Sequence, residues 1–394
     1  MAKTEGTPNV RERYELPRGI ALTLLWPNFL AKTLYLLALV VGSLSRIGVQ
    51  PRLPIGLREG RLAIEAGEVA WEHIFFTEAF QSAKEFLGDD QVVKLAIKPD
   101  QTYVRQVSDL VTKHPITHYF YDPRTGSQKL VPALFQSFQL VAIFSRRGIV
   151  PIAYCTDISL RRWRFQVAIV SALNGVCVCL TRDDIAKRMF PHDRLIGPAL
   201  MPLSQKTLAY LDKLRQKKSK SSPLKVSFFG SLYVPRVSQL EEIRKGLEEA
   251  GIDFQVRGRV PGGERISDED YWKEIISADI LVSTSSQVDI PGMDLGHVNH
   301  LIYRFTEALA CGVCLVIEDA PGVEKYFADT KDLVLWQDSK RAIDAIVQLS
   351  ANGDRIARIG RDGKTRVSKL IQTHVFWVEL EKLLRSSPLS SVAR

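Results

Sequence analysis

The chain has few cysteines, no Asn-x-Ser/Thr acceptor for N-glycosylation and no uninterrupted apolar run of membrane-spanning length. The five cysteines are odd in number and lie inside apolar runs, so we expect reduced, buried thiols in a cytoplasmic protein. They are Cys155, Cys177, Cys179, Cys311 and Cys314. A disulfide-stapled miniprotein is excluded. With 394 residues, 45% of them hydrophobic, the chain is long enough for two domains with separate cores.

The most apolar stretch covers residues 19–45 and has arginines on both sides. Pro27, Asn28 and Lys32 interrupt it, and too few apolar residues remain for a spanning helix, which needs roughly 20. A long, mostly polar segment precedes the stretch and no clear cleavage site follows it, which argues against a signal peptide. Three interpretations stay open: a helix lying on the cytoplasmic face of a membrane, a buried element of the first domain, and a true span.

The net charge of +9 is unevenly distributed. Residues 1–200 hold 25 Lys and Arg against 18 Asp and Glu, residues 201–224 hold 6 against 1, and residues 225–394 hold 22 against 25. A positive surface attracts anionic partners such as phospholipid headgroups, nucleic acid or phosphorylated carriers. The basic segment 211–222 lacks the interleaved aromatic residues of single-strand binders, so we expect no specific nucleic-acid partner.

From residue 61 onward, apolar runs of strand length alternate with helical periods, which predicts parallel sheets covered by helices. The predicted strands are 61–65, 92–97, 117–121, 150–155, 175–180 and 194–196 in the first half, and 225–229, 253–257, 280–283, 313–318 and 333–335 in the second. The expected fold class is therefore α/β, with two Rossmann-like, doubly wound domains facing a cleft. Such sheets bind ligands at the carboxyl ends of their strands.

Composition and pattern divide the chain into five parts. They are a basic and apolar N-terminal segment with a possible membrane-associating helix (1–55), a first Rossmann-like domain (56–205), a basic linker or exposed helix end (206–224), a second Rossmann-like domain (225–370), and a C-terminal helix and tail (371–394).

Two segments resemble functional motifs but lack the spacing or the context that those motifs require. The segment 360–365 ends like a phosphate-binding loop, but its glycines are too close together and no strand precedes it. The pair Cys311 and Cys314 has zinc-like spacing without a second pair, and the histidines are scattered apart from His297 and His300. We therefore expect no metal site.

The most informative residues are Arg304 and Glu307, which share one face of a predicted helix. A carboxylate can accept two hydrogen bonds from a vicinal diol such as a ribose, and an arginine offers a charged fork to phosphate. The spacing alone is equally compatible with an intrahelical ion pair on a solvated face. Gly312 permits a tight turn into the buried strand that follows.

The run F-T-E-A-L-A-C-G-V-C-L-V at 305–316 resembles the E-A-x-A-C-G-x-P-V-V signature of group 1 (family 4) glycosyltransferases of the GT-B fold. The preceding R-F-T-E and the turn at 321–324 are similar to the spore-maturation-protein-like branch. Weaker similarity at 152–157 and 174–181 in the first half, and at 228–232 and 278–283 in the second, extends the resemblance, collinearly, over about residues 60–385.

The resemblance implies an enzyme that transfers a hexosyl or related group from a nucleotide sugar, with the donor as cosubstrate and no further cofactor. Glu307 would bind the ribose. Arg236, after the turn formed by Gly230 and Ser231, would counter the diphosphate. Arg304 and Arg257 are further candidates for binding phosphate.

Three residues are candidates for a catalytic role. Asp157 follows a strand and would orient the acceptor or the sugar, or simply cap the next helix. Many retaining members carry a glutamate where this chain has Asn299, and the long loop 285–300 holds Asp289, Asp294, His297 and His300 instead. Either one of these groups fills the missing role, or the branch does without it, or activity is lost, so the stereochemistry stays unassigned.

The basic, apolar N-terminal region predicts an acceptor at a membrane, such as a lipid-linked saccharide or a cell-envelope glycan used in polysaccharide biosynthesis. The enzyme would be cytoplasmic and peripheral on the inner face of the cell membrane. The alternative is a catalytically inactive GT-B-like protein that binds a partner or an anionic surface. Loss of donor turnover with retained membrane binding would distinguish it.

Overall fold

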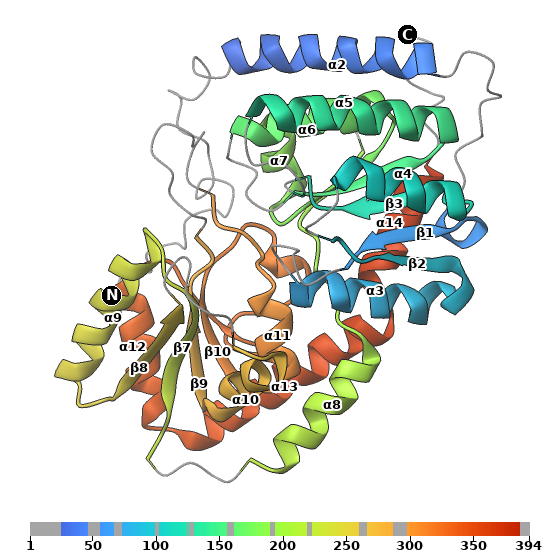
Figure 1. Ribbon diagram of the computed structural model, residues 1–394. Coiled ribbons are helices and arrows are strands. Elements are labelled where there is room, and N and C mark those ends of the chain that lie inside the picture. The colour runs from blue at the N-terminus through green and yellow to red at the C-terminus, as the bar shows by residue number, and fades with distance from the viewer. Residues whose placement is uncertain are drawn as a thin grey trace.

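The computed structural model describes residues 25–45, 56–66, 73–98, 102–123, 125, 130–155, 161–189, 194–218, 223–259, 266–286 and 298–386. These residues form two α/β domains, each built on one parallel sheet (Figure 1). The predicted fold class is confirmed at this level, because strands of both sheets alternate along the chain with the helices that cover them.

The sheet of the first domain has six strands in the order β2-β1-β3-β4-β5-β6, and all its strand pairs are parallel. Its elements are β1 (Leu62–Glu65), α3 (His73–Leu87), β2 (Val92–Leu95), α4 (Tyr103–Lys113), β3 (His118–Tyr121), α5 (Leu130–Arg147), β4 (Val150–Cys155), α6 (Arg161–Ala172), β5 (Val176–Cys179), α7 (Asp183–Met189) and β6 (Leu195–Ile196). The central strands are buried on both faces, which is why they are continuous apolar runs.

The sheet of the second domain has five parallel strands in the order β11-β10-β9-β7-β8. Its elements are β7 (Val226–Ser231), α9 (Arg236–Glu249), β8 (Phe254–Arg259), α10 (Asp268–Ser277), β9 (Ile280–Ser283), α11 (Arg304–Ala310), β10 (Cys314–Glu318), β11 (Val334–Trp336), α12 (Ser339–Ser350) and α13 (Gly353–Gln372). The segment 360–365 lies inside α13, so the rejected phosphate loop is helical.

One further helix, α2 (Leu25–Ser45), forms an outer layer over α5 and α6 (Figure 1). Its inner face is buried at Leu34 and Ala38. At Gly42 the helices approach so closely that an added Cβ would lie 2.8 Å from the Ser145 hydroxyl oxygen. The described part of the apolar stretch, residues 25–45, thus contributes one face to the first domain. Within the described ranges, no helix has both the length and the apolar character that crossing a bilayer requires.

Two helices connect the domains. The first is α8 (Gln205–Gln216), which replaces much of the basic linker predicted at 206–224 because Leu208 and Leu211 bury one face of it in the second-domain core. The second is α14 (Val375–Arg385), which follows α13 but packs into the first-domain core. Its Trp377 indole N–H donates to the Ser82 hydroxyl at 3.0 Å. The tail predicted as a separate part therefore completes the first domain.

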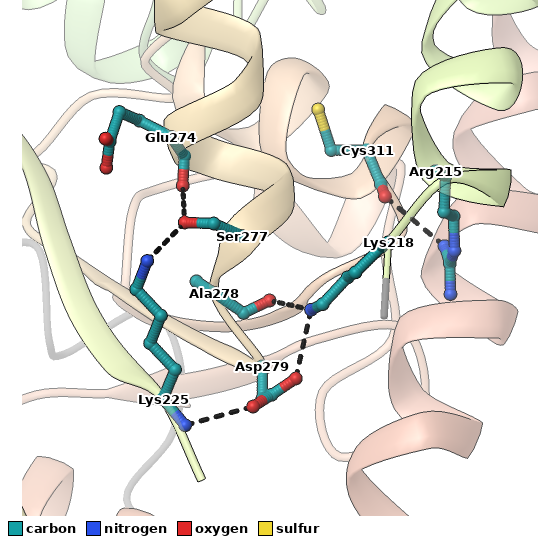
Figure 2. A network of polar contacts seen from close by, with 8 residues as sticks. All are labelled: Arg215, Lys218, Lys225, Glu274, Ser277, Ala278, Asp279 and Cys311. Atoms are coloured by element: carbon teal, nitrogen blue, oxygen red, sulfur yellow. Dashed lines mark hydrogen bonds and ion pairs between the residues drawn. The ribbon is translucent and has the colours of Figure 1, made fainter. Parts of the chain in front are cut away.

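Two basic residues, Arg215 in the last turn of α8 and Lys218 after the helix, bind the second domain (Figure 2). Lys218 donates to the Ala278 carbonyl at 2.7 Å and to the Asp279 carboxylate at 3.0 Å. The same carboxylate accepts the backbone N–H of Lys225 at 3.0 Å, and Arg215 donates to the Cys311 carbonyl at 3.3 Å. Lys218 therefore holds Asp279 beside the start of β7, and Arg215 holds the end of α8 against the end of α11.

Candidate functional site

The carboxyl ends of the two sheets meet beside α11. The backbone N–H of Leu301 donates to the carbonyl of Leu180, directly after β5, at 2.6 Å. The Thr306 hydroxyl donates to the carbonyl of Met201 at 3.1 Å. Helix α11 therefore lies at the junction of the domains, on the edge at which parallel sheets bind ligands.

Arg304 and Glu307 of α11 form a buried pair, with 8% and 3% of their surfaces exposed. Arg304 Nη1 lies 3.5 Å from Glu307 Oε2, and Arg304 Nη2 donates to the Phe229 carbonyl of β7 at 2.9 Å. The solvated ion pair that the spacing left open is excluded by this burial. A buried carboxylate and guanidinium at a domain junction form a polar site that can bind a ligand carrying hydroxyl and phosphate groups.

Tyr271 of α10 contacts both members of this pair. Its hydroxyl lies 2.7 Å from each carboxylate oxygen of Glu307, and its ring centre lies 5.4 Å from the Arg304 guanidinium carbon. Burial raises the pKa of Tyr271 well above its usual value, and Glu307 raises it further against the opposing effect of Arg304. The phenol therefore stays protonated at neutral pH and donates to the carboxylate.

Arg236 lies at the start of α9, beside the turn that ends β7. Its Nε donates to the Thr284 hydroxyl at 2.6 Å and its Nη1 donates to the Ser231 carbonyl at 2.8 Å. The guanidinium carbon lies 4.2 Å from the centre of the Tyr233 ring, and a Cβ added at Gly230 would lie 3.8 Å from Nη1. Burial lowers the pKa of Arg236, but arginine keeps its charge because its usual pKa is above about 12.

Glu318, the last residue of β10, holds the loop that carries Thr284. One carboxylate oxygen accepts the backbone N–H groups of Ser285 and Ser286 at 2.9 and 3.0 Å and the Ser286 hydroxyl at 2.5 Å. The other oxygen accepts the Gln239 amide at 2.9 Å. This buried carboxylate fixes the loop, and the loop positions Arg236.

The structure does not bring all predicted site residues together. Gly230, Ser231, Arg236, Arg304 and Glu307 lie around the end of β7. Arg257 of β8 pairs with Phe229 of β7 in the sheet, but its exposed guanidinium binds both oxygens of Glu274 at 2.7 and 2.8 Å, so its charge is already neutralised. The prediction that grouped Arg257 with the phosphate-binding residues is therefore not supported.

Of the three predicted catalytic residues, the structure describes only His300. His300 is buried, and its backbone N–H donates to the Ser285 carbonyl at 3.0 Å, which puts it beside the loop held by Glu318. Asp157 and His297 lie outside the described residues. Asn299, which replaces the glutamate of many retaining enzymes, donates its amide to the Asp319 carbonyl at 2.8 Å.

Sequence reasoning missed Tyr271, Thr284 and Glu318. Tyr271 stands next to the buried Trp272 on an amphipathic helix, where an aromatic residue indicates core packing. Thr284 is one of several small hydroxyl residues after β9. Glu318 had a detectable signal, because a charged residue that ends an otherwise apolar buried strand marks the ligand-binding edge of a parallel sheet.

All five cysteines are buried and unbridged. No group of three or more His, Cys, Asp or Glu side chains suited to a metal ion occurs within the ranges that the structure covers.

Comparison with known proteins agrees with this architecture. Residues 236–375, from the start of α9 to the start of α14, match the model of a family described as glycosyl transferase-like. No curated protein matches the chain.

Solved structures of glycosyltransferases share the fold at low sequence identity. HepE of Anabaena, in complex with UDP and in complex with UDP-glucose, is 12% identical with a TM-score of 0.51, and the match covers 83% of this chain and 100% of HepE. Sucrose-phosphate synthase of Thermosynechococcus elongatus is 11% identical with a TM-score of 0.53, covering 83% of this chain and 98% of that one. The chain therefore has the GT-B fold.

Proposed function

We propose that this protein is a glycosyltransferase of the spore-maturation-protein-like branch, which transfers a hexosyl or related group from a nucleotide sugar to a lipid-linked or cell-envelope glycan. The observation that carries the proposal is the buried Arg304–Glu307 pair at the domain junction. Arg304 and Arg236 both bind the turn at the end of β7. The glycosyl transferase-like match over 236–375 includes all three residues, and the similar HepE structures hold UDP and UDP-glucose.

In this proposal the second domain binds the donor. Glu307 accepts hydrogen bonds from the two ribose hydroxyls, which replace the Tyr271 hydroxyl now shared by its oxygens. Arg236 and Arg304 face the diphosphate. Departure of a nucleoside diphosphate builds up negative charge, and two preorganised guanidinium groups in a buried site stabilise that charge in the transition state without a metal ion.

The first domain holds the acceptor. Asp157 orients the acceptor or the sugar. In the second domain, His297 or His300 fills the role of the glutamate that Asn299 replaces, and His300 lies beside the loop that supports Arg236. Closing the two domains around the donor excludes the water that would otherwise hydrolyse it. The protein acts in polysaccharide biosynthesis on the inner face of the cell membrane.

A thermal-shift panel of nucleoside diphosphates and nucleotide sugars tests the donor site. A ligand at 100 times its dissociation constant stabilises the folded state by about 2.7 kcal/mol, so a true donor raises the melting temperature. Glu307→Gln should abolish the shift, whereas Glu242→Gln, at an exposed position of α9, should leave it intact. The absence of a shift with every nucleotide would contradict the proposal.

One observation favours a second candidate, a GT-B protein that binds donors without transferring sugar. Asn299 stands where a glutamate is expected, and its amide is engaged by the Asp319 carbonyl. An inactive protein would show the thermal shift but would form neither glycosylated product nor free nucleoside diphosphate from any donor and acceptor pair. Product formation would exclude this candidate.

A further inference from the structure

The outer face of α2 is apolar, and no element that the structure describes packs over it. Leu36, Leu37, Val40 and Leu44 lie on one side of this helix with exposed fractions between 48% and 62%, opposite the buried Leu34 and Ala38. A helix that is apolar on both sides and covered on only one leaves a contiguous hydrophobic ridge in water. Such ridges mark surfaces that bind a partner or a membrane.

The charges of α2 and of the two helices beneath it, α5 and α6, indicate which kind of partner this face binds. Helices α2, α5 and α6 contain no Asp or Glu at all, whereas every other α-helix that the structure describes contains at least one. The three helices contain six basic residues: Lys32, Arg146, Arg147, Arg161, Arg162 and Arg164. They also pack against one another, with α2 outermost (Figure 1). An apolar ridge thus lies on a layer whose charges all have one sign.

We propose that the layer formed by α2, α5 and α6 is a docking face for an anionic lipid bilayer, with the ridge Leu36–Leu37–Val40–Leu44 inserted among the headgroups. An amphipathic surface of this composition lies in the membrane interface, where acyl chains cover the apolar residues and anionic headgroups neutralise the basic ones. A second copy of the chain fits poorly, because two such faces in contact would bring two layers of the same charge together.

This inference does not depend on sugar transfer. The ridge is on the far side of α5 and α6 from the sheet, in a different part of the protein from the residues around β7. A protein without transferase activity would still bind membranes. The docking face and the donor site can therefore fail independently, and each has its own measurement.

Vesicle co-sedimentation with the full chain tests the proposal. We expect binding to vesicles of phosphatidylcholine with 30% phosphatidylglycerol to exceed binding to pure phosphatidylcholine at least about tenfold at low salt, and to weaken as salt screens the headgroup charge. The double variant Leu36→Gln/Leu44→Gln should lose at least about tenfold in binding, because two apolar side chains no longer enter the acyl region.

The charge contribution is measured separately with Arg146→Gln/Arg147→Gln, at two exposed positions at the end of α5. Each arginine near an anionic surface contributes roughly fivefold to binding, so this variant should also show a shallower salt dependence. The matched control is Val347→Gln/Val378→Gln, which changes two exposed apolar residues on α12 and α14 and should bind like the wild type. Circular dichroism and the melting temperature without ligand verify that each variant is folded.

Two results would overturn the proposal. One is wild-type binding that is equally weak for neutral and anionic vesicles at low salt. The other is a concentration-dependent dimer, seen by analytical ultracentrifugation, that Leu36→Gln/Leu44→Gln dissociates. That second outcome would assign the ridge to a second copy of the chain.

Discussion

Arg236 and Arg304 bind carbonyl oxygens on either side of Gly230. Arg304 donates to the carbonyl of Phe229 and Arg236 donates to that of Ser231. Burial lowers the pKa of Arg236; Tyr233 opposes this effect and Arg304 adds to it. Two buried guanidinium groups on either side of one glycine turn form a site that suits a bound dianion.

The first prediction concerns Arg236. Arg236→Met should weaken binding of the nucleoside diphosphate about 10- to 100-fold, because a hydrogen bond to a charged group contributes about 1.5–3 kcal/mol. Arg244→Met is the matched control: Arg244 lies on the same helix, but its guanidinium is exposed and paired with Glu241 at 2.7 Å. Isothermal titration calorimetry measures both affinities. Equal losses for the two variants would show that Arg236 has no specific role in binding.

The second prediction separates stability from ligand binding at Tyr271. Tyr271→Phe removes the hydroxyl that Glu307 accepts and should lower the free energy of unfolding by about 1–3 kcal/mol, since a buried carboxylate loses a partner. Affinity for the nucleoside diphosphate should not fall, because the ribose hydroxyls no longer compete with the phenol. Urea unfolding and calorimetry give the two quantities, with Tyr210→Phe as an exposed control. A large loss of affinity would place Tyr271 in direct contact with the donor.

The third prediction concerns Glu65, the last residue of β1. Its buried carboxylate accepts hydrogen bonds from Tyr103, from the Tyr119 hydroxyl at 2.9 Å and from the Thr125 hydroxyl at 2.8 Å. Burial raises its pKa from 4.5 to about 7, against the effect of these donors and with a smaller contribution from the nearby Asp122. Between these pH values the folded state holds a proton that the unfolded state releases.

Stability should therefore fall as pH rises from about 4.5 to about 7, by up to about 3 kcal/mol from this group, and stay level above that range. Urea unfolding across pH 4.5–8 measures the change. In Glu65→Gln the slope due to this group should vanish, whereas Glu249→Gln, at an exposed position, should keep the wild-type slope. An unchanged slope in Glu65→Gln would mean that Glu65 is already ionised at the acidic end.

The fourth prediction uses two glycines with positive φ. Gly312, between α11 and β10, has φ +67°, and a side chain there would collide with the Arg215 guanidinium. Gly251 has φ +71° with open space around it. Gly251→Ala should cost about 1 kcal/mol of backbone strain, and Gly312→Ala should cost at least about 1 kcal/mol more, because Arg215 must leave the Cys311 carbonyl. Thermal unfolding compares them, and equal losses would contradict the steric argument.

Most of the fold could be predicted from the sequence. Strands buried on both faces, such as β4 and β9, are short runs of apolar residues with distinct ends. Helix starts were harder to place. The sequence pattern predicts a helix over 239–250, but α9 begins at Arg236, directly after Pro235. This earlier start places the arginine beside the turn it binds.

From the sequence, only those contacts of the candidate site that join residues close together in the chain could be predicted. Arg304 and Glu307 are three residues apart on one helix, so their pairing follows from helical geometry. The partner hydroxyl of Tyr271 comes from another helix, 36 residues away in sequence, and no local pattern specifies that contact. The sequence of α2 likewise shows an apolar helix, but only packing against α5 and α6 determines which side remains uncovered.

The path of α14 also determines the order in which the protein is assembled during synthesis. The first domain leaves the ribosome first, yet Phe376, Trp377 and Leu380 supply part of its core from near the other end of the chain. That domain can acquire only a partial core while the second is being translated. Its packing is finished last, after both domains have emerged, so a nascent chain that stalls before residue 375 presents an apolar surface for chaperones to cover.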